Sequence, residues 1–109
     1  MHELSLAAEI MDIVKREVPG GCLLRRISLT VGGLSCVNPD SLVFCLESLV
    51  GDDVVIEVNR RPAELRCQDC GEEYTATDMY QPCICGSLRR EVLSGRELTV
   101  DEIELKEPE

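Results

Sequence analysis

The sequence predicts an α+β fold in which two helices pack on a three-stranded sheet and a four-cysteine module is inserted between two of the strands. Apolar residues recur at helical spacing in two segments and alternate with polar residues in three others. Four of the seven cysteines fall between residues 67 and 87. We therefore expect residues 1–66 plus 88–109 to form one α/β domain, with residues 67–87 as the inserted module.

The first helix is predicted to run from Leu4 to Val18. Its apolar residues lie three or four positions apart, which defines one buried face. They are Leu4, Ala7, Ala8, Met11, Val14 and Val18. The sequence Pro19-Gly20-Gly21 ends this pattern, because neither proline nor glycine continues a helix well.

The second helix is predicted to run from about Pro39 to Val50. Asn38 is a favourable N-cap, proline suits the first helical position, and Gly51 is suited to the C-terminal cap. The residues expected to face inward are Leu42, Cys45, Leu46 and Leu49.

Three strands are predicted from apolar residues that alternate with polar ones. Their buried positions are Ile27, Leu29 and Val31, then Val54, Ile56 and Val58, and finally Leu98, Val100, Ile103 and Leu105. The second strand continues irregularly past Pro62 toward Arg66. In the last strand the alternation changes parity near Asp101, which indicates a β-bulge.

The charge of the chain limits its partners. Its 109 residues carry a formal net charge of -10. Nucleic acids and anionic membranes attract basic proteins, so we expect no binding to either and look instead to proteins and metal ions. The N-terminus does not resemble a secretory signal, and no segment is apolar enough to span a bilayer. We therefore expect a cytoplasmic protein with reduced cysteines.

The cysteines at 67, 70, 83 and 85 form a CxxC pair and a CxC pair separated by twelve residues. Two short loops with this spacing can present four thiolates as a tetrahedron, which is the coordination of structural Zn²⁺. The segment is poor in aliphatic residues, so metal binding is expected to organise it as a zinc-ribbon-like module. Iron could occupy the same four thiolates. The alternative of a redox-active CxxC is disfavoured, since acidic residues follow Cys70 and no helix is predicted there.

The other three cysteines are interpreted differently. Cys22, Cys36 and Cys45 lie among apolar residues, so we expect small buried thiols with no chemical role.

The first residues of the chain form a second candidate metal site. His2 is the sole histidine. A bulky residue at the second position blocks removal of the initiator methionine, so Met1 is expected to remain with a free amine. The Met1 amine, the backbone nitrogen and imidazole of His2, and the backbone nitrogen of Glu3 can form a planar nitrogen set. Such a set suits Ni²⁺ or Cu²⁺ rather than Zn²⁺. The alternative is an exposed histidine that precedes a helix and has no role, with Glu3 and Asp40 as favourable charges at helix N-termini.

Several of these motifs together resemble the HypA family of hydrogenase nickel-incorporation proteins. They are the start Met1-His2-Glu3-Leu4-Ser5, the strand from Ile27 to Gly32, and the CxxC followed by a second pair that ends in Cys85-Gly86-Ser87. The resemblance covers nearly the whole chain. It implies a carrier that delivers nickel to the precursor of the large subunit of [NiFe]-hydrogenase, in some organisms also to urease, together with the GTPase HypB.

The resemblance also implies roles for individual residues. Met1 and His2 correspond to the primary nickel ligands, and Glu3 to a ligand through its backbone with a carboxylate nearby. Asp40 stands where the family can place another acid near the nickel. The four clustered cysteines correspond to the zinc ligands.

The chain departs from the family pattern in its second cysteine pair. The family usually has Cys-Pro-x-Cys there, whereas this chain reads Pro82-Cys83-Ile84-Cys85. Four thiolates remain, but the shorter loop changes the position of the sulfurs. Histidines beside the zinc cysteines, which some relatives carry, are absent.

Two functions of different classes follow from these observations. The first is a nickel metallochaperone, with a transported Ni²⁺ and a structural Zn²⁺. The second is a zinc-ribbon adaptor that binds another protein and transports no metal. We do not expect an enzyme, because no pairing of nucleophile and base and no phosphate-binding loop is present. A small thiol oxidoreductase is a third and weaker alternative.

Overall fold

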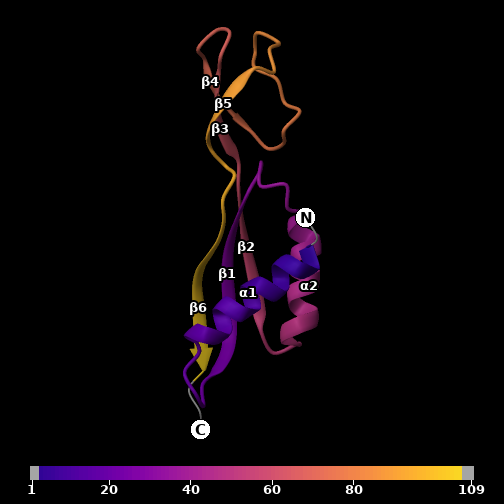
Figure 1. Cartoon of the computed structure of the whole chain (residues 1–109), viewed down its shortest axis with the longest axis vertical. Helices are drawn as coiled ribbons and strands as arrows, with labels where there is room; N and C mark the ends of the chain where they lie inside the picture. The colour runs from indigo at the N-terminus through magenta and orange to yellow at the C-terminus, as the bar shows by residue number, and fades with distance from the viewer. Residues whose placement is uncertain (1–2, 107–109) are drawn as a thin grey trace.

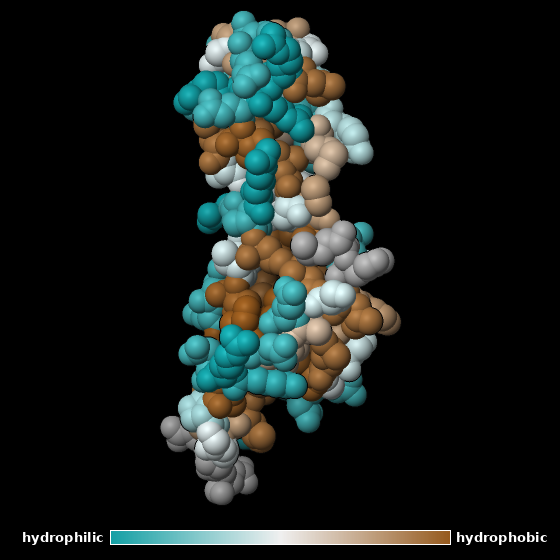
Figure 2. All heavy atoms as spheres, viewed as in Figure 1, coloured by the Kyte–Doolittle hydropathy of each residue, from teal (hydrophilic) through white to brown (hydrophobic). Residues whose placement is uncertain are grey.

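The computed structural model describes residues 3–106, which form an elongated molecule with extents of 60 × 21 × 18 Å. Two parts lie at opposite ends of the long axis and are joined by a narrow neck (Figures 1 and 2). We call residues 3–61 plus 97–106 the body and residues 63–95 the cysteine module. Each part contains its own three-stranded sheet.

The elements follow one another in a simple order. They are α1 (Glu3–Glu17), β1 (Leu23–Gly32), α2 (Pro39–Val50), β2 (Val55–Arg61), β3 (Ala63–Cys67), β4 (Glu73–Ala76), β5 (Arg90–Ser94) and β6 (Leu98–Lys106). The predicted fold class is confirmed, because both helices pack on a three-stranded sheet into which the cysteine module is inserted. The helices and the body strands lie within a few residues of their predicted positions.

The sheet of the body has the order β2-β1-β6. Strands β1 and β2 are parallel, so they need a crossover, and α2 provides it. Strands β1 and β6 are antiparallel. Ser28 pairs with Glu102 and Leu29 with Val100, which leaves Asp101 as the extra residue and confirms the predicted bulge.

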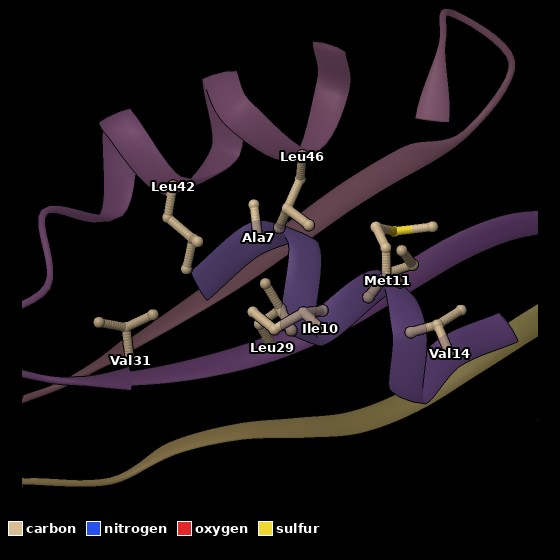
Figure 3. Close-up of a cluster of buried hydrophobic side chains, with 9 residues drawn as sticks. Ala7, Ile10, Met11, Val14, Leu29, Val31, Leu42 and Leu46 are labelled. Carbon is tan, nitrogen blue, oxygen red and sulfur yellow. The ribbon is translucent and has the colours of Figure 1, made fainter. Parts of the chain in front are cut away.

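The core of the body lies between the two helices and one face of its sheet (Figure 3). Its buried residues are Ala7, Ile10, Met11, Val14, Ile27, Leu29, Val31, Leu42 and Leu46. The buried faces of the two helices are narrower than predicted, because Leu4, Ala8 and Leu49 are exposed. Ala7 of α1 lies between Leu42 and Leu46 of α2 in Figure 3, so α1 begins close to the N-terminal half of α2.

The ends of α2 form as their residues predict. The side chain of Asn38 accepts a hydrogen bond from the backbone N–H of Ser41 at 3.1 Å, which caps the first turn. Gly51 has a φ of 84°, and its N–H donates to the carbonyl of Glu47. This positive φ explains why the helix ends at a glycine.

The second sheet is a feature that the sequence did not predict. It is antiparallel throughout, with the order β4-β3-β5. The predicted irregular continuation past Pro62 is the separate strand β3, whose residues Ala63, Leu65 and Cys67 are buried. Its small core consists of Leu34, Ala63, Leu65 and Ala76, with Tyr74 and Val92 packed against it.

The neck consists of residues 32–34, 61–63 and 95–97. The backbone N–H groups of Gly32, Gly33 and Leu34 each donate to a carbonyl at 2.8 Å; the acceptors are Glu97, Arg61 and Gly95, respectively. The chain segments approach so closely that a Cβ on Gly32 would lie 2.1 Å from the carbonyl oxygen of Gly95. The absence of a side chain at Gly32 therefore permits the two parts to join.

Candidate metal centre

The four predicted zinc cysteines come together at the end of the cysteine module farthest from the body. Cys67 is the last residue of β3, and Cys70 lies in the turn that follows it. The second pair lies in the loop that precedes β5. All four Sγ atoms lie within 4.8 Å of one another, and among residues 3–106 no other group of three or more His, Cys, Asp or Glu side chains forms such a cluster.

The distances between the sulfurs fit a single tetrahedral metal ion. The Sγ atoms of Cys67 and Cys85 are 3.6 Å apart, and those of Cys70 and Cys83 are 3.5 Å apart. Four thiolates at the Zn–S bond length of about 2.3 Å have sulfurs about 3.8 Å apart. Each sulfur of the short CxC loop therefore lies beside one sulfur of the CxxC pair, at about the spacing of two ligands on a tetrahedral ion.

Each cysteine pair is shaped by a backbone turn that ends in glycine. Gly71 donates its N–H to the carbonyl of Cys67, and Gly86 donates its N–H to the carbonyl of Cys83. Their φ angles are 79° and 88°, a conformation that costs glycine little. The glycines therefore allow the chain to turn back beside the sulfurs.

Contacts between the two cysteine loops, which sequence reasoning missed, hold the pairs in position. Asp69 accepts from the Arg89 guanidinium at 2.9 Å and from the Ser87 hydroxyl. The N–H of Gln68 donates to the carbonyl of Arg89 at 2.9 Å. The only signal in the sequence is an acid beside one pair and a base beside the other, which is too common to identify such a contact.

The electrostatics of the cluster favour a thiolate at one cysteine. Hydrogen bonds to Cys67, chiefly from the backbone N–H of Cys70, lower the pKa of Cys67 to about 6 against the opposing effect of burial. At Cys70 the backbone N–H of Glu72 acts to lower the pKa. The hydrogen bond with Cys83 and desolvation outweigh it and raise the pKa of Cys70 to about 12.

The thiol of Cys85 behaves like that of Cys70. The backbone N–H of Ser87 acts to lower its pKa, but the hydrogen bond with Cys67 and desolvation raise the pKa above its ordinary value. A sulfur that donates to a neighbouring thiolate holds its own proton more tightly. Because thiolates at this spacing repel one another, all four can ionise together only when a cation lies between them.

The predicted nickel ligands are placed only in part. Met1 and His2 lie outside the described residues. Glu3 occupies the first turn of α1, and Asp40 occupies the first turn of α2. The carboxylate of Asp40 forms an ion pair with Arg60 at 2.6 Å, although the Asp40 side chain is 85 % exposed. Asp40 therefore already has a cationic partner within the body.

The three remaining cysteines lie apart from the cluster. Cys22 and Cys45 are half-buried, and Cys45 packs against the core of the body. The expectation of a buried thiol is wrong for Cys36, which is exposed and has a φ of 63°. Its position in the connection between β1 and α2 explains the difference, because that segment turns at the surface.

The fold and the cluster together define a class of protein: a small α/β body that carries a separate four-thiolate metal module. The profile of the HypA family, described as "Hydrogenase/urease nickel incorporation, metallochaperone, hypA", matches residues 1–105. The chain therefore belongs to the HypA family. None of the described helices is long and apolar enough to cross a membrane.

Named relatives agree with this assignment. A protein of a Nostoc species named "Hydrogenase maturation factor HypA" is 36% identical over 113 residues, covering 98% of this chain and 97% of the relative. One from Rhizobium leguminosarum with the same name is 35% identical, covering 96% and 99%, respectively. The solution structure of the Ni metallochaperone HypA from Helicobacter pylori has the same fold, with a TM-score of 0.60, 22% identity and 100% coverage of both chains.

Proposed function

We propose that this protein is a nickel metallochaperone of hydrogenase maturation, which binds Ni²⁺ at its N-terminus and delivers it to the precursor of a [NiFe]-hydrogenase large subunit. Membership of the HypA family over nearly the whole chain carries this proposal. By the same resemblance, urease is a second recipient and HypB is the GTPase partner. The protein acts in the cytoplasm as a carrier and not as an enzyme.

The nickel site is proposed to consist of the Met1 amine, His2 and the backbone of Glu3. Nitrogen donors in a plane suit the d-electron configuration of Ni²⁺, whereas the thiolate cluster suits a tetrahedral ion. Glu3 lies in the first turn of α1, and α1 begins close to the N-terminal half of α2. Asp40, in the first turn of α2, is proposed to lie near the nickel once its ion pair with Arg60 opens.

The four clustered cysteines are proposed to hold a resident Zn²⁺. Supporting this are the tetrahedral spacing of the sulfurs and the glycine turns behind each pair. When bound, the ion supplies the folding free energy that the small core of the module lacks. Residues 67–87 are proposed as the zinc-binding module and residues 1–66 plus 88–109 as the nickel-binding domain. This division cuts through the cysteine module of the structure, because nearly all of β3 and all of β5 lie outside residues 67–87.

Calorimetric titration of Ni²⁺ into protein with a native, tag-free N-terminus tests the function, with zinc counted by elemental analysis. We expect one nickel site and one zinc per chain. The nickel site should be lost in His2→Ala and in a variant with one residue added before Met1, while zinc is retained. The extended variant leaves every side chain intact, so it isolates the terminal amine.

Maturation is measured in cells that lack their own nickel-incorporation protein, as hydrogenase activity restored by each variant. His2→Ala should fail to restore activity, and excess nickel in the medium should rescue it. If nickel binding survives both changes, or if His2→Ala matures hydrogenase normally, the zinc-ribbon adaptor is the better explanation.

A further inference from the structure

An apolar groove of about 940 Å³ lies in the body at the end opposite the cysteine cluster. It is enclosed by the C-terminal halves of α1 and α2, the start of β1 and the approach to β2. Its apolar lining includes Val18, Leu23, Leu24, Leu49, Val50 and Val54. In Figure 2, brown apolar atoms reach the surface between teal ones over this lower part of the molecule.

Two leucines of the groove are poorly covered. Leu23 is 62% exposed and Leu49 is 47% exposed, although both come from regular elements next to the core. Large apolar side chains gathered in one concave surface are characteristic of binding sites, whereas singly scattered ones are not. This volume is at the upper limit for small-ligand pockets, so the open groove is better matched to a segment of polypeptide.

The rim of the groove is basic in an otherwise acidic chain. Lys15, Arg25 and Lys106 line it, and Asp53 is the one acid among the lining residues within 3–106, whereas the whole chain has a net charge of -10. Lys15 also suits the C-terminal turn of α1, where a cation is favourable. That explanation does not extend to Arg25 and Lys106, which belong to strands; Arg25 also lies 3.7 Å from Glu104.

We propose that this groove binds an acidic amphipathic helix of a partner protein. Leucine-like side chains spaced three and four apart would lie on the groove floor, and flanking carboxylates would meet the basic rim. Elsewhere the negative surface of the chain would repel such a helix, so the charge selects both the partner and the docking position. The inference does not depend on nickel, because the groove contains none of the predicted nickel or zinc ligands.

Titration of a model peptide into ¹⁵N-labelled, zinc-loaded full-length protein without nickel tests the proposal. The probe is a capped peptide of about 16 residues, or roughly four turns, with leucines at helical spacing and glutamates elsewhere. We expect amide shifts confined to the groove, chiefly at Lys15, Leu23, Leu49 and Val54. A peptide with lysines in place of the glutamates, and a scrambled acidic peptide, should each bind at least about tenfold more weakly.

The chain offers a matched pair of charge variants on neighbouring residues. Lys15→Glu reverses a charge on the rim, whereas Arg16→Glu makes the same change one residue away on a side chain that does not line the groove. Lys15→Glu should weaken the acidic peptide at least about fivefold, and Arg16→Glu less than about twofold. Leu49→Ser in the groove should weaken binding of the acidic peptide. Leu4→Ser should not, because this similarly exposed leucine lies at the N-terminal end of α1, away from the groove.

Three results would overturn the proposal. The lysine peptide could bind as well as the acidic one, the shifts could lie outside the groove, or both charge variants could weaken binding equally. Sedimentation of the protein alone supplies a fourth: a dimer dissolved by Leu49→Ser would show that the groove is occupied by a second copy of the chain. Preserved amide dispersion in Lys15→Glu ensures that a loss of binding is not a loss of folding.

Discussion

The body and the cysteine module each contain a three-stranded sheet, but the two parts differ in the interactions that stabilise them. The body buries nine apolar side chains from two helices and its central strand, which is enough to order it without a ligand. The core of the module consists of only two leucines and two alanines, and one of the leucines, Leu34, comes from the body side of the neck. We therefore expect the order of the module to depend on an ion between its thiolates. On this view, one chain combines a part that is expected to fold by hydrophobic burial with a part that is expected to fold by metal binding.

Loss of one metal ligand should give the largest effect, because it should disorder the module and leave the body folded. Cys67→Ser removes a thiolate that is 2% exposed at the end of β3. We expect loss of the proposed zinc and of ordered amides over residues 63–95, because structural Zn²⁺ contributes apparent free energies of about 10–16 kcal/mol. The amide spectrum of the body should persist. Cys45→Ser, which leaves the cluster intact, should keep its zinc, and collapse of the body with the module would contradict this view.

A cavity in the core of the body should destabilise the body and leave the metal content of the module unchanged. Leu46 is 0% exposed, so Leu46→Ala should lower the free energy of unfolding of the body by about 2–5 kcal/mol. Urea unfolding followed by circular dichroism measures this change, while elemental analysis should show unchanged zinc. Phe44→Ala, on the same helix at a side chain that is 71% exposed, should change the unfolding free energy by less than about 0.5 kcal/mol.

A side chain in the neck should affect both parts together. Gly32→Ala places a Cβ 2.1 Å from the carbonyl oxygen of Gly95, and this backbone cannot move aside without disturbing the three neck hydrogen bonds. We expect a loss of about 1–3 kcal/mol and amide shifts in both the body and the module. In Gly20→Ala, where a Cβ has no neighbour within 4 Å, neither effect is expected.

The bulge in β6 should give a small pH effect that belongs to the body alone. The hydroxyls of Thr30 and Thr99 donate to the Asp101 carboxylate at 2.5 and 2.7 Å and lower the pKa of Asp101 below its ordinary value. Because the unfolded chain then binds the proton more readily, stability should fall as the pH drops through the acidic range below about 4. In NMR titrations, Thr30→Val should raise the midpoint of Asp101, whereas Thr75→Val in the module should leave it unchanged.

The body could be predicted from the sequence because its residues repeat at the periods of helix and strand. Even the bulge at Asp101 was visible as a change in the alternation. The second sheet could not be predicted in this way, since β4 spans four residues and neither β4 nor β5 has a long apolar alternation. The cysteine spacing predicted the cluster, but the contact of Asp69 with Arg89 joins residues twenty positions apart and has no local pattern.

The two chain segments that join the module to the body determine which changes in the length of the module the body can tolerate. Strands β2 and β6 flank β1, and their neck ends are close enough for Arg61 and Glu97 to form an ion pair at 3.9 Å. The chain therefore leaves the body and returns to it at one place, with the whole module between these two points. We therefore expect changes in loop length within the module, such as the short spacing between Cys83 and Cys85, to leave the strand register of the body unchanged. A short turn in place of residues 63–95 should leave a body that still folds.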